Sequence, residues 1–339
     1  MTTSAVTLPE SVWADAVDLL RDPTDATLVC HVAPDGDALG SMLALARVLR
    51  ARGTTVTCTW GDERWSVPPS YGWLADIDTV TPPSAVGDSP SLMVVLDTAS
   101  RDRLGVLGPL ADRAAGLLVI DHHAHNSGLG GVQLVDSTAA ATAVVVEELL
   151  RRMGADIDAH TATLLYVGLV TDTGSFQHSV TTPAVHAVAG RLLAAGARPD
   201  VVAQQLWGSR PFGFQRVLGA ALARVQLDRD AVSGQGLVWT WTTQEDLVTA
   251  GVGLDDVEAV IDVVRSAREA DVAAVLKQDT DGSFRVSTRS RGGTDVGAAC
   301  AALGGGGHRL AAGFTSWDDE ATTIERLRQA LERAPALQR

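Results

Sequence analysis

The chain has little of what marks secreted, membrane-spanning or zinc-finger proteins. Its three cysteines, Cys30, Cys58 and Cys300, form neither an even disulfide set nor a metal-type spacing, which indicates a reduced, cytoplasmic protein. No apolar run approaches the roughly 20 residues that span a bilayer. The N-terminal Met1-Thr-Thr-Ser lacks the basic and apolar regions of a signal peptide. We therefore expect no membrane among its partners.

The chain also lacks an excess of positive charge, because its formal net charge is -14. A protein that grips long duplex nucleic acid by its backbone needs a large basic face, so we expect no such partner. A small phosphorylated substrate is compatible with this charge, since bound cations and a few arginines can create a local positive site.

The length of 339 residues predicts two domains. In the first, 1–190, apolar strands alternate with helical patterns, which predicts an α/β fold with a doubly wound, mostly parallel sheet. The expected strands are 26–31, 55–60, 92–96 and 117–120. The expected helices are 38–52, 139–153, 159–170 and 183–195.

The remainder of the chain predicts a helical linker and a smaller α+β domain. The linker is placed at 191–230, with helical patterns at 201–206 and 214–227, and the second domain at 231–339. In that domain the expected strands are 236–241, 271–276 and 284–288, and the expected helices are 254–268 and 296–303. The segment 279–282 has the composition of a hairpin turn.

Five short motifs supply carboxylates, imidazoles and glycines in one chain. They are His31-Val-Ala-Pro-Asp35-Gly-Asp37-Ala-Leu-Gly-Ser41, Asp97-Thr-Ala, Asp121-His122-His123, Asp172-Thr-Gly174, and Gly304, Gly305, Gly306 and Gly307 followed by His308. The first three motifs come directly after predicted strands. Open α/β sheets bind ligands outside the carboxyl ends of their strands, so we expect these motifs to share one site.

The carboxylates of Asp35, Asp37, Asp97 and Asp172 favour a metal site. Together they would carry about four negative charges, and unpaired clustered carboxylates repel one another and have raised pKa values. Two divalent cations would neutralise them. Oxygen and imidazole ligands suit Mn²⁺ or Mg²⁺, and the histidines favour Mn²⁺.

Each motif alone also has a purely structural interpretation. Asp37 would cap the helix that follows it, and Asp97 and Asp172 would cap or end their own elements. The triplet 121–123 would be a solvated polar turn. The combination of motifs favours the metal site, in which Asp121 orients a ligating imidazole.

The glycine run precedes a histidine and follows a predicted helix. Glycines let backbone N–H groups approach an anion closely, and His308 can donate to a phosphate oxygen. One of the arginines Arg285, Arg289 and Arg291 could reach the same anion. The alternatives are a flexible loop and a solvated strand edge.

Together these motifs resemble the DHH phosphoesterase superfamily, named for the triplet at 121–123. The similarity covers nearly the whole chain. The first part is similar to the DHH domain, and the last part, which also contains Ala311-Ala-Gly313, is similar to the DHH-associated domain. In its compact length the chain is similar to the branch of nanoRNases and phosphatases of 3'-phosphoadenosine 5'-phosphate (pAp). Its composition is similar to that of actinobacterial members, some of which also hydrolyse cyclic di-AMP.

The resemblance implies two Mn²⁺ ions, with Mg²⁺ or another divalent cation as alternatives. Asp97 would bridge the two ions. The other ligands would be His31 and Asp35 for one ion, and Asp37, His122 and Asp172 for the second.

The resemblance also implies roles in catalysis and substrate binding. His123 would lie beside the reactive phosphate, and Asp121 would support the histidines. In the second domain, His308 and the glycines 304–307 would bind a substrate phosphate with help from Arg289. The active site would lie in the cleft between the domains.

The function implied by the resemblance is hydrolysis of short oligoribonucleotides and of linear or cyclic dinucleotides, such as pApA and cyclic di-AMP, by water attack at two metal ions. The alternative is a phosphatase that acts mainly on pAp, and a third hypothesis is a nucleotide sensor without turnover. The expected assembly is a homodimer.

Overall fold

The computed structural model describes residues 5–123 and 128–337. The N-terminal Met1–Ser4, on which the expectation of no signal peptide depends, lies outside the described residues. The chain divides into two compact units, 1–208 and 209–339, so the division falls inside the stretch predicted as a linker. Among the described residues, no helix combines the length and the apolar surface needed to cross a membrane.

The first unit contains a five-stranded sheet in which all neighbouring strands are parallel, in the order β2-β1-β3-β4-β5. Its strands are β1 (Asp25–Cys30), β2 (Thr55–Trp60), β3 (Leu92–Leu96), β4 (Gly116–Asp121) and β5 (Val132–Val135). The predicted doubly wound α/β fold is confirmed. Strand β5 was not predicted, because it is short and only one of its residues is buried.

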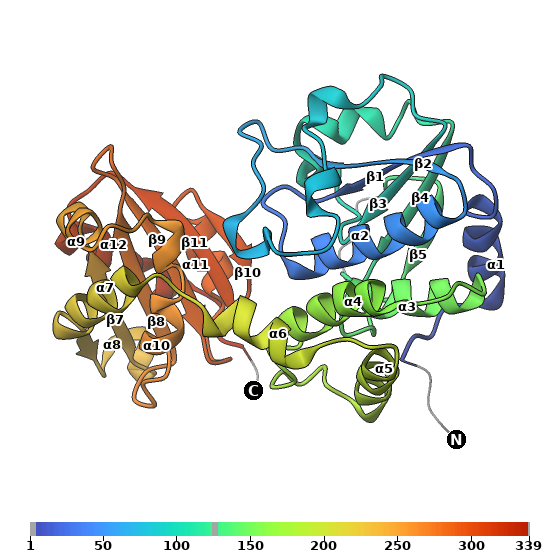
Figure 1. Cartoon of the computed structure of the whole chain (residues 1–339). Helices are drawn as coiled ribbons and strands as arrows, with labels where there is room; N and C mark the ends of the chain where they lie inside the picture. The colour runs from blue at the N-terminus through green and yellow to red at the C-terminus, as the bar shows by residue number, and fades with distance from the viewer. Residues whose placement is uncertain (1–4, 124–127, 338–339) are drawn as a thin grey trace. The chain divides into compact units, whose positions relative to one another are not determined.

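The α-helices of this unit are α1 (Glu10–Leu19), α2 (Gly36–Ala51), α3 (Thr142–Arg152), α4 (Ala159–Asp172), α5 (Pro183–Ala194) and α6 (Pro199–Ala203), followed by a π-helical turn, Gln204–Gly208. Helices α2, α3 and α4 lie along one side of the sheet (Figure 1). The 3-10 segment η4 (Asp102–Leu110) packs on the other side. Along β3, Val94 and Leu96 join the core under the helices, whereas Met93 and Val95 join the core under η4. Both faces of the sheet are therefore buried, as its continuous apolar strands predict.

The second unit contains a six-stranded mixed sheet in the order β10-β11-β9-β8-β7-β6, in which only β7 and β8 are parallel neighbours. Its strands are β6 (Gln226–Asp228), β7 (Leu237–Thr242), β8 (Val272–Gln278), β9 (Phe284–Ser290), β10 (Gly306–His308) and β11 (Ala311–Ser316). The helices α11 (Val296–Ala301) and α12 (Glu320–Arg333) pack on one face, with the short turn α8 (Ala231–Gly234) beside them. The helices α7 (Phe212–Ala223), α9 (Gln244–Ala250) and α10 (Val260–Val264) form a layer on the other face.

Three predictions for the second unit are wrong. The helix expected at 214–227 ends at Ala223, and 226–228 is instead strand β6, which pairs with β7. The helix expected at 254–268 consists of a 3-10 turn, Asp255–Val257, and the short α10. Part of the expected glycine loop is strand β10, because 306–308 pairs with β11. Strand β11 and helices α9 and α12 were not predicted.

Candidate metal centre and active site

The loop after β1 positions two carboxylates at the start of α2. Asp35 is the N-cap of the helix, since its Oδ1 accepts hydrogen bonds from the backbone N–H groups of Asp37 (3.0 Å) and Ala38 (3.1 Å). The interpretation of Asp37 as the cap is therefore wrong. Asp37 lies in the first turn of α2 and is fully buried. A fully buried carboxylate requires partners that balance its charge.

Those partners come mainly from the first residues of α3. The backbone N–H of Thr142 donates to Asp37 Oδ2 (2.6 Å), and that of Ala143 donates to Asp37 Oδ1 (2.9 Å). The hydroxyl of Ser41 donates to Oδ1 from within α2 (3.2 Å). A helix N-terminus carries unpaired N–H groups and a positive dipole end, so it stabilises this negative charge.

Glycines allow α2 to approach α4, which brings Asp172 toward Asp37. A Cβ on Gly40 would lie 2.3 Å from the carbonyl oxygen of Leu164, and a Cβ on Gly168 would lie 2.5 Å from Asp37 Oδ1. Neither position has room for a side chain. Asp172 is the last residue of α4, and the close packing therefore places its carboxylate near that of Asp37.

Asp97 follows β3, and His31 follows β1. These neighbouring strands flank the point where the strand order reverses, the usual ligand site of such sheets. Asp97 Oδ2 lies 3.3 Å from His31 Nε2, and Asp97 Oδ1 lies 3.7 Å from His122 Nε2. The Thr142 hydroxyl donates to Oδ1 (2.8 Å). The two carboxylate oxygens of Asp97 thus face different imidazoles.

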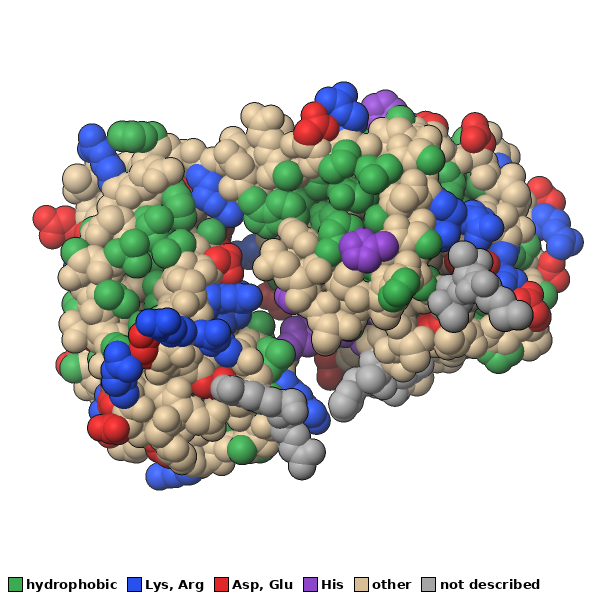
Figure 2. Space-filling view, turned by 90° about the horizontal axis from the view of Figure 1, so that it is seen from below, with side chains coloured by type: hydrophobic (Ala, Val, Ile, Leu, Met, Phe, Trp, Pro, Cys, Tyr) green, Lys and Arg blue, Asp and Glu red, His purple; other side chains and the backbone are tan. Residues whose placement is uncertain are grey.

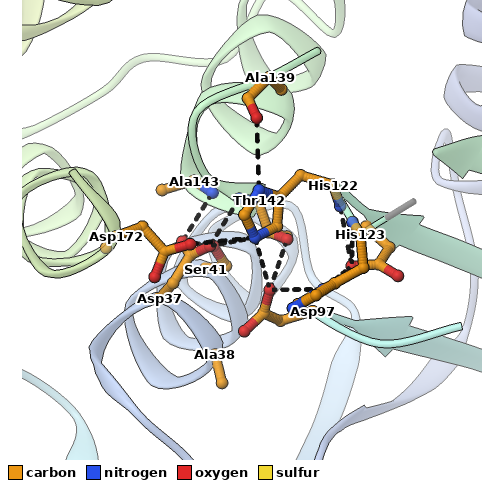
Figure 3. A network of polar contacts seen from close by, with 12 residues as sticks. Asp37, Ala38, Ser41, Asp97, His122, His123, Ala139, Thr142, Ala143 and Asp172 are labelled. Atoms are coloured by element: carbon orange, nitrogen blue, oxygen red, sulfur yellow. Dashed lines mark hydrogen bonds and ion pairs between the residues drawn. The ribbon is translucent and has the colours of Figure 1, made fainter. Parts of the chain in front are cut away.

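The triplet 121–123 is organised by a buried aspartate. Asp121, fully buried at the end of β4, accepts with Oδ1 from the backbone N–H groups of His122 (2.8 Å) and His123 (3.1 Å) and from His123 Nδ1 (2.7 Å). His122 Nδ1 donates to Ala139 O (3.3 Å), which leaves Nε2 facing Asp172 Oδ2 at 3.0 Å (Figure 3). The triplet is therefore an ordered part of this cluster and not a solvated turn.

The structure gathers the six predicted metal ligands, together with His123, into three groups, and within each group the donor atoms lie within 4.8 Å of one another. The groups are His31, Asp35 and Asp97; Asp37, His122 and Asp172; and Asp97, His122 and His123. Asp97 and His122 each belong to two groups. Carboxylate and imidazole donors in this arrangement suit divalent cations such as Mn²⁺, Mg²⁺ or Zn²⁺.

The chemistry of the donor atoms fits a bound cation. His31 Nδ1 donates to Val32 O (2.8 Å), so Nε2 presents a lone pair, and this buried atom has no hydrogen-bond partner within 5–123 and 128–337. It faces Asp97, whose oxygens also carry lone pairs. Two facing lone pairs repel each other unless a positive charge lies between them.

Burial and neighbouring charges shift the pKa values of the clustered carboxylates and of His122. Burial, together with the charges of Asp35 and Asp172, raises the pKa of Asp97 to about 8. Burial and the charges of Asp97 and Asp172 also raise the pKa of Asp37. Burial opposes protonation of His122, but the hydrogen bond to Asp172 and the surrounding carboxylates outweigh it and raise its pKa to about 10. The cluster therefore favours positive charge, supplied by protons or by metal ions.

In the second unit, strand pairing places Arg289 and His308 on one face of the sheet. Arg289 on β9 lies opposite Ala311 on β11, which lies opposite His308 on β10. Neighbouring strands are about 4.8 Å apart, so the two side chains start roughly 10 Å from each other. On strands β9, β11 and β10, the next row on this face consists of Ser287, Gly313 and Gly306. Small residues thus form the floor between a guanidinium and an imidazole.

The other predicted residues of this region differ in what they contact. Arg285 forms an ion pair with Asp279 (2.7 Å), and Arg291 donates to the carbonyl of Ala267 (3.1 Å). Arg289 Nη1 donates to the carbonyl of Thr288 (2.9 Å), and burial lowers its pKa. Of the three arginines, Arg289 is the one on the same row as His308.

Three of the glycines are required by the backbone, among them Gly307, whose φ is +142° and whose Cβ would lie 2.6 Å from Ala311 O. A Cβ on Gly305 would lie 2.1 Å from Gly313 O, so no side chain fits there. Gly304 has a φ of +83°, which side chains disfavour. The run therefore has a structural reason for its glycines in addition to the predicted approach to an anion.

Comparison with known proteins identifies both units. The model of the DHH family, N-terminal domain, matches residues 26–169, and that of the DHHA1 domain matches 246–336. The bifunctional oligoribonuclease and PAP phosphatase NrnA of Thermus thermophilus is 34% identical over 85% of this chain and 83% of its own. The chain belongs to the DHH family of phosphoesterases. It is thus a hydrolase of phosphoric ester bonds.

Two further comparisons agree with this membership. A probable bifunctional oligoribonuclease and PAP phosphatase NrnA of Streptococcus mutans is 27% identical over 85% of this chain and 88% of its own. The crystal structure of an exopolyphosphatase-related protein from Bacteroides fragilis has a TM-score of 0.87 at 21% identity, covering 96% of each chain. At that identity the structural likeness shows a shared fold.

The residues that hydrogen-bond to the candidate metal ligands were missed by the sequence analysis. Thr142, Ser41 and Ala139 contact Asp97, Asp37 and His122, respectively. Ser41 lies at the end of the first motif, and its spacing of four from Asp37 along a helix was an available signal. Thr142 and Ala139 had no such signal, because they lie in an alanine-rich stretch far along the chain from their partners.

Proposed function

We propose that this protein is a Mn²⁺-dependent phosphodiesterase that hydrolyses short oligoribonucleotides and linear or cyclic dinucleotides, including pApA and cyclic di-AMP. The observation that carries the proposal is that Asp97 groups with His31 and Asp35 on one side and with His122 and His123 on the other. His122 in turn also groups with Asp37 and Asp172, so two candidate cation sites adjoin each other. Sites with two metal ions about 4 Å apart are typical of enzymes that displace groups at phosphorus.

In this proposal six residues would hold two Mn²⁺ ions, and Asp97 would be shared between them. The ligands are His31, Asp35, Asp37, Asp97, His122 and Asp172. Cations held there would lower the pKa of a water molecule and stabilise negative charge on the phosphoryl oxygens. The hydrogen bonds of His31 Nδ1 and His122 Nδ1 to backbone carbonyls direct the Nε2 atoms to the metals.

His123 is assigned to the reactive phosphate. Asp121 accepts from its Nδ1, which fixes the proton on that nitrogen and restrains the ring, while the buried carboxylate keeps a constant position through its two backbone hydrogen bonds. An imidazole held in this way is a preorganised partner for a phosphoryl oxygen.

We assign a second substrate phosphate to the face that carries Arg289 and His308. The small floor between them leaves space for an anion, and an arginine suits phosphate oxygens geometrically. On the side of the molecule seen in Figure 2, basic side chains are interspersed with acidic ones and form no continuous basic surface. This distribution of charge favours substrates of a few nucleotides over long duplexes.

Phosphatase activity on pAp is the second candidate. The observation that favours it is that the named relatives from Thermus and Streptococcus are both called bifunctional, with oligoribonuclease and PAP phosphatase activities.

We also propose that the protein is located in the cytoplasm and forms a homodimer. Cys30, Cys58 and Cys300 are buried thiols without disulfide bonds, as expected in a reducing compartment. Closed twofold dimers are the commonest soluble assemblies. Sedimentation would test the dimer by a mass of twice the 35.4 kDa chain.

The first experiment compares hydrolysis of pApA, cyclic di-AMP, pAp and a 24-nucleotide RNA by metal-free protein with and without Mn²⁺. Asp97→Ala tests the shared ligand, and Asp18→Ala, which removes an exposed carboxylate of α1, is the matched control. We expect Mn²⁺-dependent cleavage of the dinucleotides by the native protein and the control only. Faster turnover of pAp would favour the phosphatase, and no turnover with tight dinucleotide binding would favour a sensor.

A further inference from the structure

We infer that Thr142 is a positioning residue whose hydroxyl fixes the orientation of Asp97 between the two ligand groups. The inference rests on the proposed function, because it concerns the carboxylate assigned to bridge the metal ions. It adds a residue outside all five motifs to the machinery of the site.

Each carboxylate oxygen of Asp97 faces a different imidazole, and one hydrogen bond from Thr142 restrains the carboxylate. Oδ2 lies 3.3 Å from His31 Nε2, and Oδ1 lies 3.7 Å from His122 Nε2. The Thr142 hydroxyl donates to Oδ1 over 2.8 Å. A rotation of the carboxylate would break this hydrogen bond and turn one oxygen away from its imidazole. The hydroxyl therefore selects the bridging orientation.

Packing alone does not explain a threonine at this position. Thr142 is fully buried beside the apolar core residues Ala143, Val144 and Val145, where valine would fill the same volume. Its hydroxyl carries a desolvation cost that only a hydrogen bond offsets. The acceptor is Asp97, which follows strand β3 and lies 45 residues earlier in the chain.

The start of α3 contacts three of the proposed ligands. Thr142 N–H and Ala143 N–H hold Asp37, the Thr142 hydroxyl holds Asp97, and the carbonyl of Ala139 just before the helix accepts from His122 (Figure 3). Three of these four contacts use the backbone, which any residue supplies. The hydroxyl is the one contact that depends on the identity of the side chain, so it is where a mutation isolates the positioning effect.

Thr142→Val tests the inference, because it removes the hydroxyl and keeps the shape and both backbone N–H donors. Thr142→Ser restores the hydroxyl, and Thr240→Val is the matched control, since it deletes a fully buried hydroxyl of the second unit that donates to Ala221 O. Mn²⁺ titration of the full-length metal-free chain by calorimetry gives stoichiometry and affinity. Turnover of pApA gives kcat and KM separately.

We expect Thr142→Val to weaken Mn²⁺ binding by about 10- to 100-fold, the usual effect of removing a partner that orients a ligand. Its kcat should fall at saturating Mn²⁺ while KM changes little, and Thr142→Ser should restore both. If Thr142→Val is insoluble, Thr142→Ala gives the same comparison with Thr142→Ser.

Three outcomes would overturn the inference, and they distinguish its failure from that of the proposed function. Native affinity, stoichiometry and kcat in Thr142→Val would refute the positioning role and leave the proposed function intact, as would a serine variant as impaired as the valine variant. A native protein that binds no Mn²⁺ would refute the proposed function together with this inference.

Discussion

Replacing Asp97 by asparagine should stabilise the metal-free protein and remove its response to metal. The amide side chain would keep an oxygen for the Thr142 hydroxyl and present an N–H₂ group toward His31 Nε2, which now faces a carboxylate oxygen at 3.3 Å. The substitution therefore removes a buried negative charge without opening a cavity. Most substitutions of buried polar residues destabilise a protein, so the sign of this effect is diagnostic.

The magnitude follows from the pKa of Asp97, which burial and the neighbouring carboxylates raise from 3.8 to about 8. At pH 7 the carboxyl group is ionised in the unfolded chain and mainly neutral in the fold. Each pH unit above the unfolded pKa adds about 1.4 kcal/mol to the cost of folding until pH 8 is reached. At pH 7 this cost is about 4 kcal/mol, and asparagine does not incur it.

The assay is thermal unfolding in EDTA between pH 5 and 8.5. For a unit of this size 1 kcal/mol corresponds to roughly 2–4 °C, so Asp97→Asn should raise the melting temperature of the first unit by roughly 10 °C at pH 7. Because the cost begins above the unfolded pKa, the advantage should shrink as the pH falls toward 4 and be largest near pH 8.

Mn²⁺ should stabilise the native protein much more than the variant. At a concentration 100 times Kd, one bound ion would stabilise the native protein by about 2.7 kcal/mol, whereas the variant should gain little. The difference in free energy of unfolding between the variant and the native protein should therefore fall by about 2.7 kcal/mol when Mn²⁺ is added. A variant less stable than the native protein in EDTA at pH 8, or one that responds fully to Mn²⁺, would refute the reasoning.

Three further predictions concern other parts of the chain. Arg289→Ala should raise KM for pApA at least tenfold with an unchanged Mn²⁺ isotherm, and a kinetic assay in which KM stays native would remove Arg289 from the substrate site. Gly40→Ala should lower the stability of the first unit by about 1–3 kcal/mol, because its Cβ would lie 2.3 Å from Leu164 O; denaturant unfolding measures this. Asp246→Asn should destabilise the second unit by about 2 kcal/mol at pH 7, since Arg224 holds the pKa of Asp246 at about 2. That difference should persist above pH 4 and diminish as the pH falls toward 2, which unfolding curves at pH 7 and pH 3 would detect.

The proposed metal ligands could be found from the sequence because each lies in a motif tied to a recognisable element. His31, Asp97 and Asp121 come at the ends of apolar strands, where side chains converge in a parallel sheet. The residues that orient them depend instead on how helices meet. Nothing local distinguishes Thr142 from a threonine that merely begins a helix, and the close approach of α2 and α4 at Gly168 exists only in the folded chain.

The second unit shows a different limit of sequence interpretation. Val257, Val260, Ile261 and Val264 have the spacing of one helix face, and all four are buried. The backbone there is nevertheless a 3-10 turn followed by a short helix. Periodicity reports which side chains are buried, and two short turns on one surface satisfy it as well as a long helix does. For the glycine run, composition alone cannot specify that 306–308 pairs with β11 as a strand, because this pairing depends on the folded sheet.

Local preferences are broken at the proposed metal centre and satisfied around it. Ala33 and Asp97 have positive φ values of 51° and 62°, which non-glycine residues disfavour, and Asp37 and Asp97 are buried carboxylates. These features destabilise the same few residues, yet the surrounding sheet and helices follow the expected burial patterns. Such a concentration of unfavourable features is expected where function, and not stability, determines the residues. In this protein a divalent cation would offset the largest of them, the buried negative charge, so metal binding and folding of the first unit should be thermodynamically linked.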